Sequence, residues 1–314
     1  MEISTKLDVT NQTPAPARNP GPSWGYQFLR VTDWVLPEVI YRPLRAIGTM
    51  IAMAGMPKQR KYSREYLSLV FGRPATTQEV FHHFFAFEEA LMQRLRIANG
   101  KHIECEYSPG SDDFRQWMEN GGPVILGTMH VGASDMLGFQ LAGKSQNPIY
   151  LVRQRVANSH DTEALSRRFG SALHFIWVNE PSEMLYALKE ALETTSAVAI
   201  QCDRVEQGAR TEVFEFLGSS RLFPFTIYHL ALIFERPVLL SFGIPGANGL
   251  SQLYAAPRYS KIPGEPKEES LKRARDHFQG FLRLLESRLR EDPYIWFNFL
   301  PLNPVSTPAP DSAK

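Results

Sequence analysis

The chain has few cysteines, almost no net charge and no apolar run long enough to cross a membrane. Its two cysteines, Cys105 and Cys202, are too few for a disulfide framework and lack the spacing of a metal site, which favours a reducing, cytoplasmic setting. A formal net charge of +1 gives no basic footprint for a nucleic-acid partner. A Gly-x-Ser-x-Gly elbow is also missing, which argues against an α/β-hydrolase.

The composition suits a soluble or peripheral protein with a sizeable core. Hydrophobic residues make up 43% of the 314 residues, and charged residues 21%. Both ends are polar, so residues 1–23 and 305–314 are predicted to be disordered tails, and the first of them lacks the apolar core of a secretory signal. Between the tails we expect a helical segment at 24–61 and an α/β domain at 62–304.

Short apolar runs separated by helical patterns predict a parallel sheet. Val124–Leu126, Pro148–Val152 and Ala197–Gln201 are strand-like, whereas Asp161–Phe169 and Ser182–Leu192 carry apolar residues on one helical face. Alternation of this kind indicates βαβ units. The predicted fold is therefore α/β, with a mostly parallel central sheet flanked by helices.

A histidine and an acid follow the first of these strands. His130 lies just beyond the apolar run, Gly132 provides a turn, and Asp135 follows where Ser134 is suited to cap a helix. A neutral imidazole accepts a proton from a hydroxyl or amine, and a carboxylate fixes its tautomer and stabilises the imidazolium. His130 and Asp135 are therefore a candidate general base and orienting acid. On spacing alone, a structural hydrogen bond for His130 and a helix-dipole contact for Asp135 are the simpler explanation.

Charged residues also follow the next two strand-like runs that were identified. Arg153 comes directly after Pro148–Val152, and Asp203 and Arg204 come just after Ala197–Gln201. Because ligands bind at the carboxyl edge of a parallel sheet, we expect these side chains to converge with His130 on one rim. The alternative is that charges end buried strands simply because solvent begins there.

These features together resemble the lysophospholipid-acyltransferase-like superfamily, in particular its late lipid A (lauroyl/myristoyl) acyltransferase branch. The resemblance rests on the His-x4-Asp spacing of His130 and Asp135, an arginine after the next strand, and an aspartate after a later one. The segment Asp292–Phe299 is similar to the tryptophan-containing segment near the end of those enzymes. The likeness extends from about Trp24 to Phe299, and the Glu-Gly-Thr-Arg motif of the glycerol-phosphate branch is absent.

The resemblance implies an acyltransferase. It would move a fatty acyl chain from an acyl thioester, carried by acyl carrier protein or coenzyme A, to a hydroxyl or amine of a lipid or lipid-like acceptor. The thioester is a co-substrate, so no further cofactor and no metal are expected. His130 would be the general base and Asp135 its acid. Substrate binding would fall to four residues: Gly132, Arg153, Asp203 and Arg204.

Several roles remain open within this interpretation. Arg153 is expected either to bind a phosphate with its planar fork or to meet the developing oxyanion, for which backbone N–H groups near Gly132 are also candidates. Asp203 is expected to order Arg153 or Arg204. Cys202 on the same rim leaves a covalent route open.

Two other classes of protein also remain open. The first is a non-catalytic lipid- or acyl-chain-binding protein on the same scaffold. The second is a metal-dependent hydrolase that uses His130, Asp135 and Asp203 as ligands, although only one histidine is well placed for it.

The segment Trp34–Met56 is the most apolar part of the N-terminal region, but prolines and charges such as Arg45 interrupt it. We interpret it as an amphipathic helix in a membrane interface, followed by Lys58, Arg60 and Lys61 facing anionic headgroups. The alternative is an ordinary helix packed on the domain. The resemblance supports the membrane surface, at the cytoplasmic face of a bacterial inner membrane, in peripheral or monotopic form.

Two longer helices are predicted elsewhere. Thr76–Ile97 carries an apolar stripe that packs in the core or lines an acyl groove, with Thr77 as its cap. Its adjacent His82 and His83 point to different faces and so do not form a metal pair. The helix Glu265–Leu289 has a charged outer face and is expected to cover the sheet.

Overall fold

The computed structural model describes residues 29, 31–98, 104–132, 134, 147–153, 169–178, 180–205, 210–245 and 250–302. Asp135, the two predicted tails and nearly all of the predicted helix Asp161–Phe169 lie outside these ranges.

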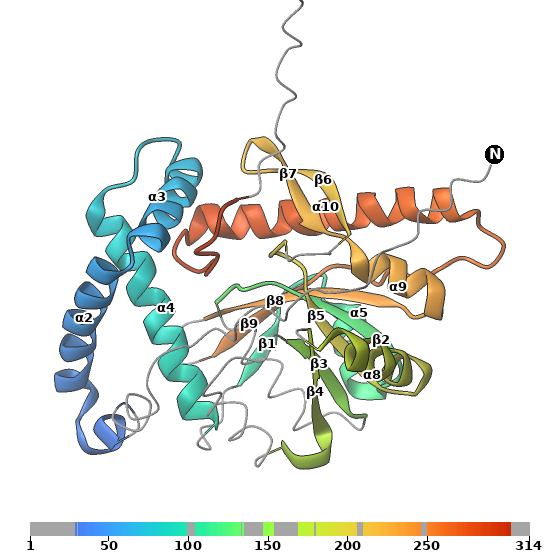
Figure 1. Cartoon of the computed structure of the whole chain (residues 1–314), viewed down its shortest axis with the longest axis horizontal. Helices are drawn as coiled ribbons and strands as arrows, with labels where there is room; N and C mark the ends of the chain where they lie inside the picture. Colours follow the sequence, from blue (N-terminus) through green and yellow to red (C-terminus); the bar gives the residue numbers. More distant parts are fainter. Residues whose placement is uncertain are drawn as a thin grey trace, which may run out of the picture.

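Seven strands form the central sheet, shown in Figure 1. Their spatial order is β1 (Cys105–Tyr107), β9 (Ser251–Ala255), β8 (Val238–Pro245), β2 (Val124–Thr128), β5 (Ala197–Gln201), β3 (Ile149–Arg153) and β4 (Leu173–Trp177). The pair β8–β9 is antiparallel and every other neighbouring pair is parallel. The prediction of a mostly parallel sheet flanked by helices is confirmed.

Helices cover both faces of this sheet because its central strands bury both sets of alternating side chains. Ile125 of β2 packs in a core with residues of α8 (Pro181–Glu193), α9 (Thr226–Phe234) and α10 (Lys267–Glu291). Its neighbours Val124 and Leu126 face the other way, into a core with Phe114 and Trp117 of α5 (Asp112–Asn120). A short 3-10 helix, η1 (Gly170–Ala172), precedes β4.

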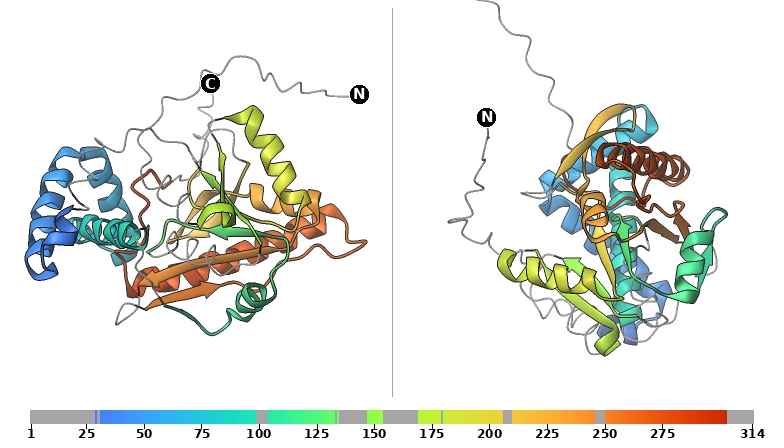
Figure 2. Two further views of the ribbon diagram at one scale, coloured as in Figure 1. Left: turned by 90° about the horizontal axis from the view of Figure 1, so that it is seen from below. Right: turned by 90° about the vertical axis from the view of Figure 1, so that its right-hand side faces the viewer.

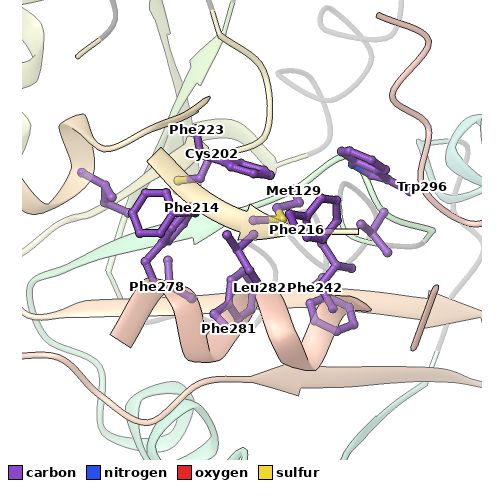
Figure 3. Close-up of a cluster of buried hydrophobic side chains, with 14 of the residues drawn as sticks. Met129, Cys202, Phe214, Phe216, Phe223, Phe242, Phe278, Phe281, Leu282 and Trp296 are labelled. Carbon is purple, nitrogen blue, oxygen red and sulfur yellow. The ribbon is translucent and has the colours of Figure 1, made fainter. Parts of the chain in front are cut away.

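The larger core lies between the sheet, α10 and a separate antiparallel hairpin made of β6 (Thr211–Phe216) and β7 (Ser219–Pro224). Figure 3 shows Phe278 and Leu282 of α10 directed toward Phe214 and Phe216 of the hairpin. The rings of Phe214 and Phe278 meet edge to face, with centroids 4.8 Å apart. Met129 is buried in the same cluster directly after β2, so this core extends beneath the carboxyl ends of the central strands.

Three helices group at one end of the sheet, away from α8, in Figures 1 and 2. They are α2 (Glu38–Gly55), α3 (Pro57–Phe71) and α4 (Thr77–Ala98). Within the described part of the chain, none of the helices is both long and apolar enough to span a membrane.

The starts of two helices differ from the predictions by one or two residues. Thr76, rather than Thr77, caps α4: its hydroxyl accepts the N–H of Glu79, whose carboxylate accepts the N–H of Thr76 in return. Helix α10 begins at Lys267, directly after a proline, rather than at Glu265.

Candidate active site

His130 and Asp203 meet because their strands are neighbours in the sheet. Thr128 at the end of β2 pairs with Gln201 at the end of β5, so the two chains leave the same edge side by side. The His130 Nδ1 atom lies 2.7 Å from Asp203 Oδ1, and the His130 backbone N–H donates to Asp203 Oδ2 at 2.9 Å. The parallel pairing of β2 and β5 thus brings the two side chains into hydrogen-bonding contact, and we call them the His130–Asp203 pair.

This pair occupies the place where the sheet topology favours ligand binding. The chain leaving β2 continues to β3, on the far side of β5, whereas the chain leaving β5 returns past β2 to β8. Adjacent strands whose connections run in opposite directions leave a crevice at their carboxyl ends.

Asp203 is a buried, ionised carboxylate. Burial by itself raises the pKa of Asp203, but the charge and hydrogen bond of His130, the charge of Arg204 and the indole of Trp296 outweigh it and lower the pKa to about 2. Trp296 donates its Nε1–H to Asp203 Oδ2 at 2.9 Å. Three donated hydrogen bonds therefore fix both carboxylate oxygens of Asp203.

The ionised carboxylate determines how the proton sits on a neutral His130 ring. A carboxylate only accepts hydrogen bonds, so Nδ1 carries the hydrogen and Nε2 keeps its lone pair. The His130 side chain is 16% exposed, whereas that of Asp203 is fully buried. This is the arrangement of a general base, with an acid that orients the ring and stabilises the imidazolium.

The segment Ile295–Phe297 is bonded to His130 and to the two residues that follow it, and we call it the clamp. The Phe297 N–H donates to the carbonyl oxygen of His130, and the Gly132 N–H donates to that of Ile295, both at 2.7 Å. Val131 pairs with Trp296 as an antiparallel bridge between these two bonds. The backbone of Trp296 is therefore held against Val131, next to His130. The indole of Trp296 in turn binds Asp203, the partner of His130.

Gly132 allows the chain after β2 to approach β8 closely. It has φ +44° and pairs with Gly243 as a parallel bridge. A Cβ atom at this position would lie 2.7 Å from the Gly243 carbonyl oxygen, which no side chain tolerates. The N–H of Gly132 is donated to Ile295, so this glycine serves backbone packing, and its contact with substrate stays a prediction.

The two arginines predicted at this edge lie at different distances from His130. Arg204 follows Asp203 and donates its Nη2–H to the Phe297 carbonyl oxygen at 3.0 Å, so it joins the clamp. Arg153 ends β3, which β5 separates from β2, so it lies two strand spacings from His130, or about 10 Å. Its guanidinium lies 5.9 Å from the ring centroid of Phe175.

Asp203 thus makes the Nδ1 contact that sequence analysis predicted for Asp135, which lies outside the described residues. The printed bonds of Asp203 go to His130 and Trp296, and the charge of Arg204 also acts on its carboxylate, so the prediction that Asp203 orders Arg153 or Arg204 stays a prediction. Sequence reasoning missed the roles of Asp203 and Trp296 because it had no strand order. The only signal was the likeness of the segment around Trp296 to the end of the lipid A acyltransferases.

His83 supports Trp296 from α4. It is fully buried, and burial lowers its pKa to about 4, so the ring is neutral. Its Nε2–H donates to the Trp296 carbonyl oxygen, and its Nδ1 accepts the Ser63 hydroxyl, both at 2.8 Å. His82 is exposed, so the prediction that the two histidines point to different faces is confirmed.

Cys202 is buried beneath the site. Desolvation raises the pKa of its thiol far above the usual range, so it remains protonated and is a poor nucleophile. Among the residues that the structure describes, no three His, Cys, Asp or Glu side chains gather closely enough to hold a metal ion.

Compared with protein-family models and with curated proteins, the chain matches none of them.

Proposed function

We propose that the protein is an acyltransferase that moves a fatty acyl chain from an acyl thioester to a hydroxyl or amine of a lipid or lipid-like acceptor. The observation that carries the proposal is the His130–Asp203 pair, in which a buried ionised carboxylate holds the hydrogen on Nδ1 and so leaves Nε2 unprotonated at the carboxyl edge of the sheet. The donor is the thioester of acyl carrier protein or of coenzyme A.

In this mechanism His130 Nε2 removes the proton of the acceptor hydroxyl or amine as that group attacks the thioester carbonyl carbon. The resulting tetrahedral intermediate collapses, the carbon–sulfur bond breaks, and the leaving thiolate takes the proton back from the imidazolium. General-base assistance of this kind contributes about 10²–10⁴ in rate.

Asp203 stabilises the imidazolium while it exists. Its two oxygens are already fixed by Trp296 and by the His130 backbone, so it gains charge complementarity without having to reorient. No protein nucleophile is required because the thioester is already activated, and the protonated state of Cys202 agrees with this.

Arg153 is proposed to bind the acceptor or donor rather than the reacting carbonyl. Its strand ends at the same sheet edge, two strand spacings or about 10 Å from the strand that leads to His130, a backbone separation that suits a phosphate on the remote part of a substrate.

The protein is also proposed to work at a membrane surface, as a peripheral or monotopic protein on the cytoplasmic face of a bacterial inner membrane. The outward face of α2 is apolar: Val39 is 86% exposed and Ile51 is 70% exposed, and Trp34 just before the helix is equally accessible. An exposed apolar face that is followed along the chain by Lys58 and Lys61 suits the boundary between acyl chains and anionic headgroups.

The apolar face of α2 equally favours a second candidate, a lipid-binding protein without catalysis. Lipid binding without catalysis gives no reason for a buried carboxylate to be bonded to a partly exposed histidine. Variants that break the His130–Asp203 pair therefore distinguish the two candidate functions.

The test compares lipids from cells that express the protein, each single variant, or no protein, by mass spectrometry. We expect His130→Ala to abolish the lipid species that differ by one acyl chain. Asp203→Asn should reduce them nearly as far, because an amide does not stabilise the imidazolium. His82→Ala, an exposed histidine on α4, is the matched control and should leave them unchanged. Near-normal acylation by a folded His130→Ala protein, judged by circular dichroism, would contradict the mechanism and favour the binding protein.

A further inference from the structure

A groove of about 1080 Å³ lies between α3, the start of α4, β7 and the residues Pro301 and Leu302. It is separate from the His130–Asp203 pair. On α3, Arg60 and Arg64 line the groove, while Tyr66 on the opposite side of the same helix is buried and meets the ring of Trp296 edge to face at 5.1 Å. The helix therefore stands between the groove and the clamp around His130.

Arg221 of β7 lines this groove and is a buried cation. The residue is only 6% exposed, and its guanidinium donates to two carbonyl oxygens, from Nε to Phe216 at 3.1 Å and from Nη1 to Leu302 at 3.3 Å. Among the described residues it forms no ion pair with a carboxylate, and desolvation lowers its pKa. Buried charges are normally paired with an opposite charge, so this guanidinium lacks a neutralising group.

Three more cations line the groove with Arg221: Arg60, Lys61 and Arg64. Of the described residues that line the groove, Glu65 is the only acid, and its Oε1 lies 3.8 Å from Lys61 Nζ in an exposed pair. The groove therefore holds an excess of positive charge, whose natural complement is an anion such as a phosphate.

The remaining walls are mostly apolar, with Ser68 and Thr77 as their polar members. Leu69 of α3 is 37% exposed and Pro57 lies at one end, whereas Val80 of α4 and Leu302 are buried. Pro57 directly follows Met56, an exposed residue at the end of α2. The groove thus begins where the outward apolar face of α2 ends, and it combines an anion-binding side with a surface for hydrocarbon.

We propose that this groove binds the headgroup of an anionic phospholipid, with the phosphate near Arg221, Arg60 and Arg64 and the first part of an acyl chain against Leu69 and Pro57. This is a lipid site additional to the proposed acyl-transfer site. It would hold a lipid from the surface on which α2 rests, not the group that is acylated.

Isothermal titration calorimetry on the whole protein tests the proposal, using dihexanoyl phosphatidylglycerol as a soluble monomer. We expect one lipid to bind per chain, with much weaker binding of dihexanoyl phosphatidylcholine and of inorganic phosphate. The double variant Arg60→Gln, Arg64→Gln should lose about tenfold in affinity, because two partly exposed cations are removed. Lys189→Gln, Lys272→Gln removes the same charge from α8 and α10 and should bind as the unaltered protein does.

Other results would overturn the proposal. Equal losses in the two double variants would mean a non-specific charge effect, and unchanged affinity in the groove variant would exclude the site. Equally tight binding of inorganic phosphate would exclude a lipid, and equally tight binding of phosphatidylcholine would exclude recognition of the anion.

Arg221→Lys keeps the charge but loses the fork, so a folded variant should bind more weakly. His130→Ala should bind the lipid normally, which separates this site from the proposed acyl transfer.

Discussion

The two helices α2 and α10 are both amphipathic, but they present opposite faces to the protein. Helix α10 buries Phe278, Phe281 and Leu285 and turns its charges to solvent. Helix α2 buries Arg45 and Thr49 and leaves residues such as Ile47 exposed. Both helices thus carry an apolar stripe in their sequence, but only the structure shows whether that stripe faces the protein core.

The inward face of α2 is held by charges. Arg45 is buried and bonds to Glu88 of α4 at 2.7 Å and to Glu38 at 2.5 Å. Arg96 of α4 binds Glu38 and Asp33 from the other side. Such a network fixes the orientation of α2 and leaves its apolar side exposed at the protein surface. The following four predictions concern the free energy of unfolding, from the largest effect to the smallest; the first, third and fourth test this contrast, and the second tests the helix on which α2 packs.

We expect the largest loss from Phe278→Ala in α10. This ring is fully buried among Phe214, Phe223 and Phe225, so its removal leaves a cavity and should cost about 3–5 kcal/mol. Urea unfolding measures the change, and Arg283→Ala on the exposed side of α10 is the control, expected within about 0.5 kcal/mol of the unaltered protein. A loss below about 1 kcal/mol would mean that α10 does not depend on its buried face.

The second prediction concerns pH and the first half of α4. The pKa of His83 is about 4 in the folded protein and returns to its ordinary value of 6.5 on unfolding. The neutral buried ring therefore contributes its full stability above pH 6.5, and about 3 kcal/mol of it is lost as the pH falls toward 4. Urea unfolding of His83→Gln should show a shallower decline over this range. Identical slopes in the two proteins would contradict the prediction.

A smaller loss is expected from Arg45→Met in α2. The change leaves Glu88 half-buried without its partner, and burial already raises the pKa of Glu88, so we expect a loss of about 2 kcal/mol. The double variant Arg45→Met, Glu88→Gln removes the unpaired charge and should recover part of that stability. No recovery would show that Arg45 acts through packing alone.

The smallest effect on stability is expected on the outer face of α2. Leu44→Ser, Ile51→Ser should stay within about 0.5 kcal/mol of the unaltered protein, because neither side chain is buried. The same variant should co-sediment less with anionic vesicles, which salt should also weaken. Ile233→Ser on α9, where the isoleucine is 70% exposed as Ile51 is, should bind vesicles normally. Unchanged vesicle binding in the α2 variant would remove the argument for an interfacial helix.

Sequence patterns predicted the sheet well where periodicity was strong. The runs that became β2, β3 and β5 were predicted to within two residues, because continuous apolar stretches are typical of buried parallel strands. Helix starts were less accurate, because the choice of Thr76 over Thr77 depends on which hydroxyl reaches Glu79.

The partner of His130 was harder to predict for a physical reason. Spacing along the chain favours Asp135, only five residues away, whereas the structure brings Asp203 to the ring from 73 residues away. Which strand lies next to β2 is determined by packing over the whole sheet and leaves no local trace in the sequence. The same holds for Trp296, whose indole reaches Asp203 across 93 residues.

The position of Trp296 also has a consequence for how the protein is made. The chain emerges from the ribosome from its N-terminal end, so the strands that carry His130 and Asp203 are synthesised long before Ile295, Trp296 and Phe297. Until residues 295–297 have been synthesised, Asp203 lacks one of its three donors and Gly132 lacks its backbone acceptor. The site is thus completed only after Phe297 has been added, and a nascent chain stalled earlier holds the histidine and the carboxylate without the clamp that fixes them.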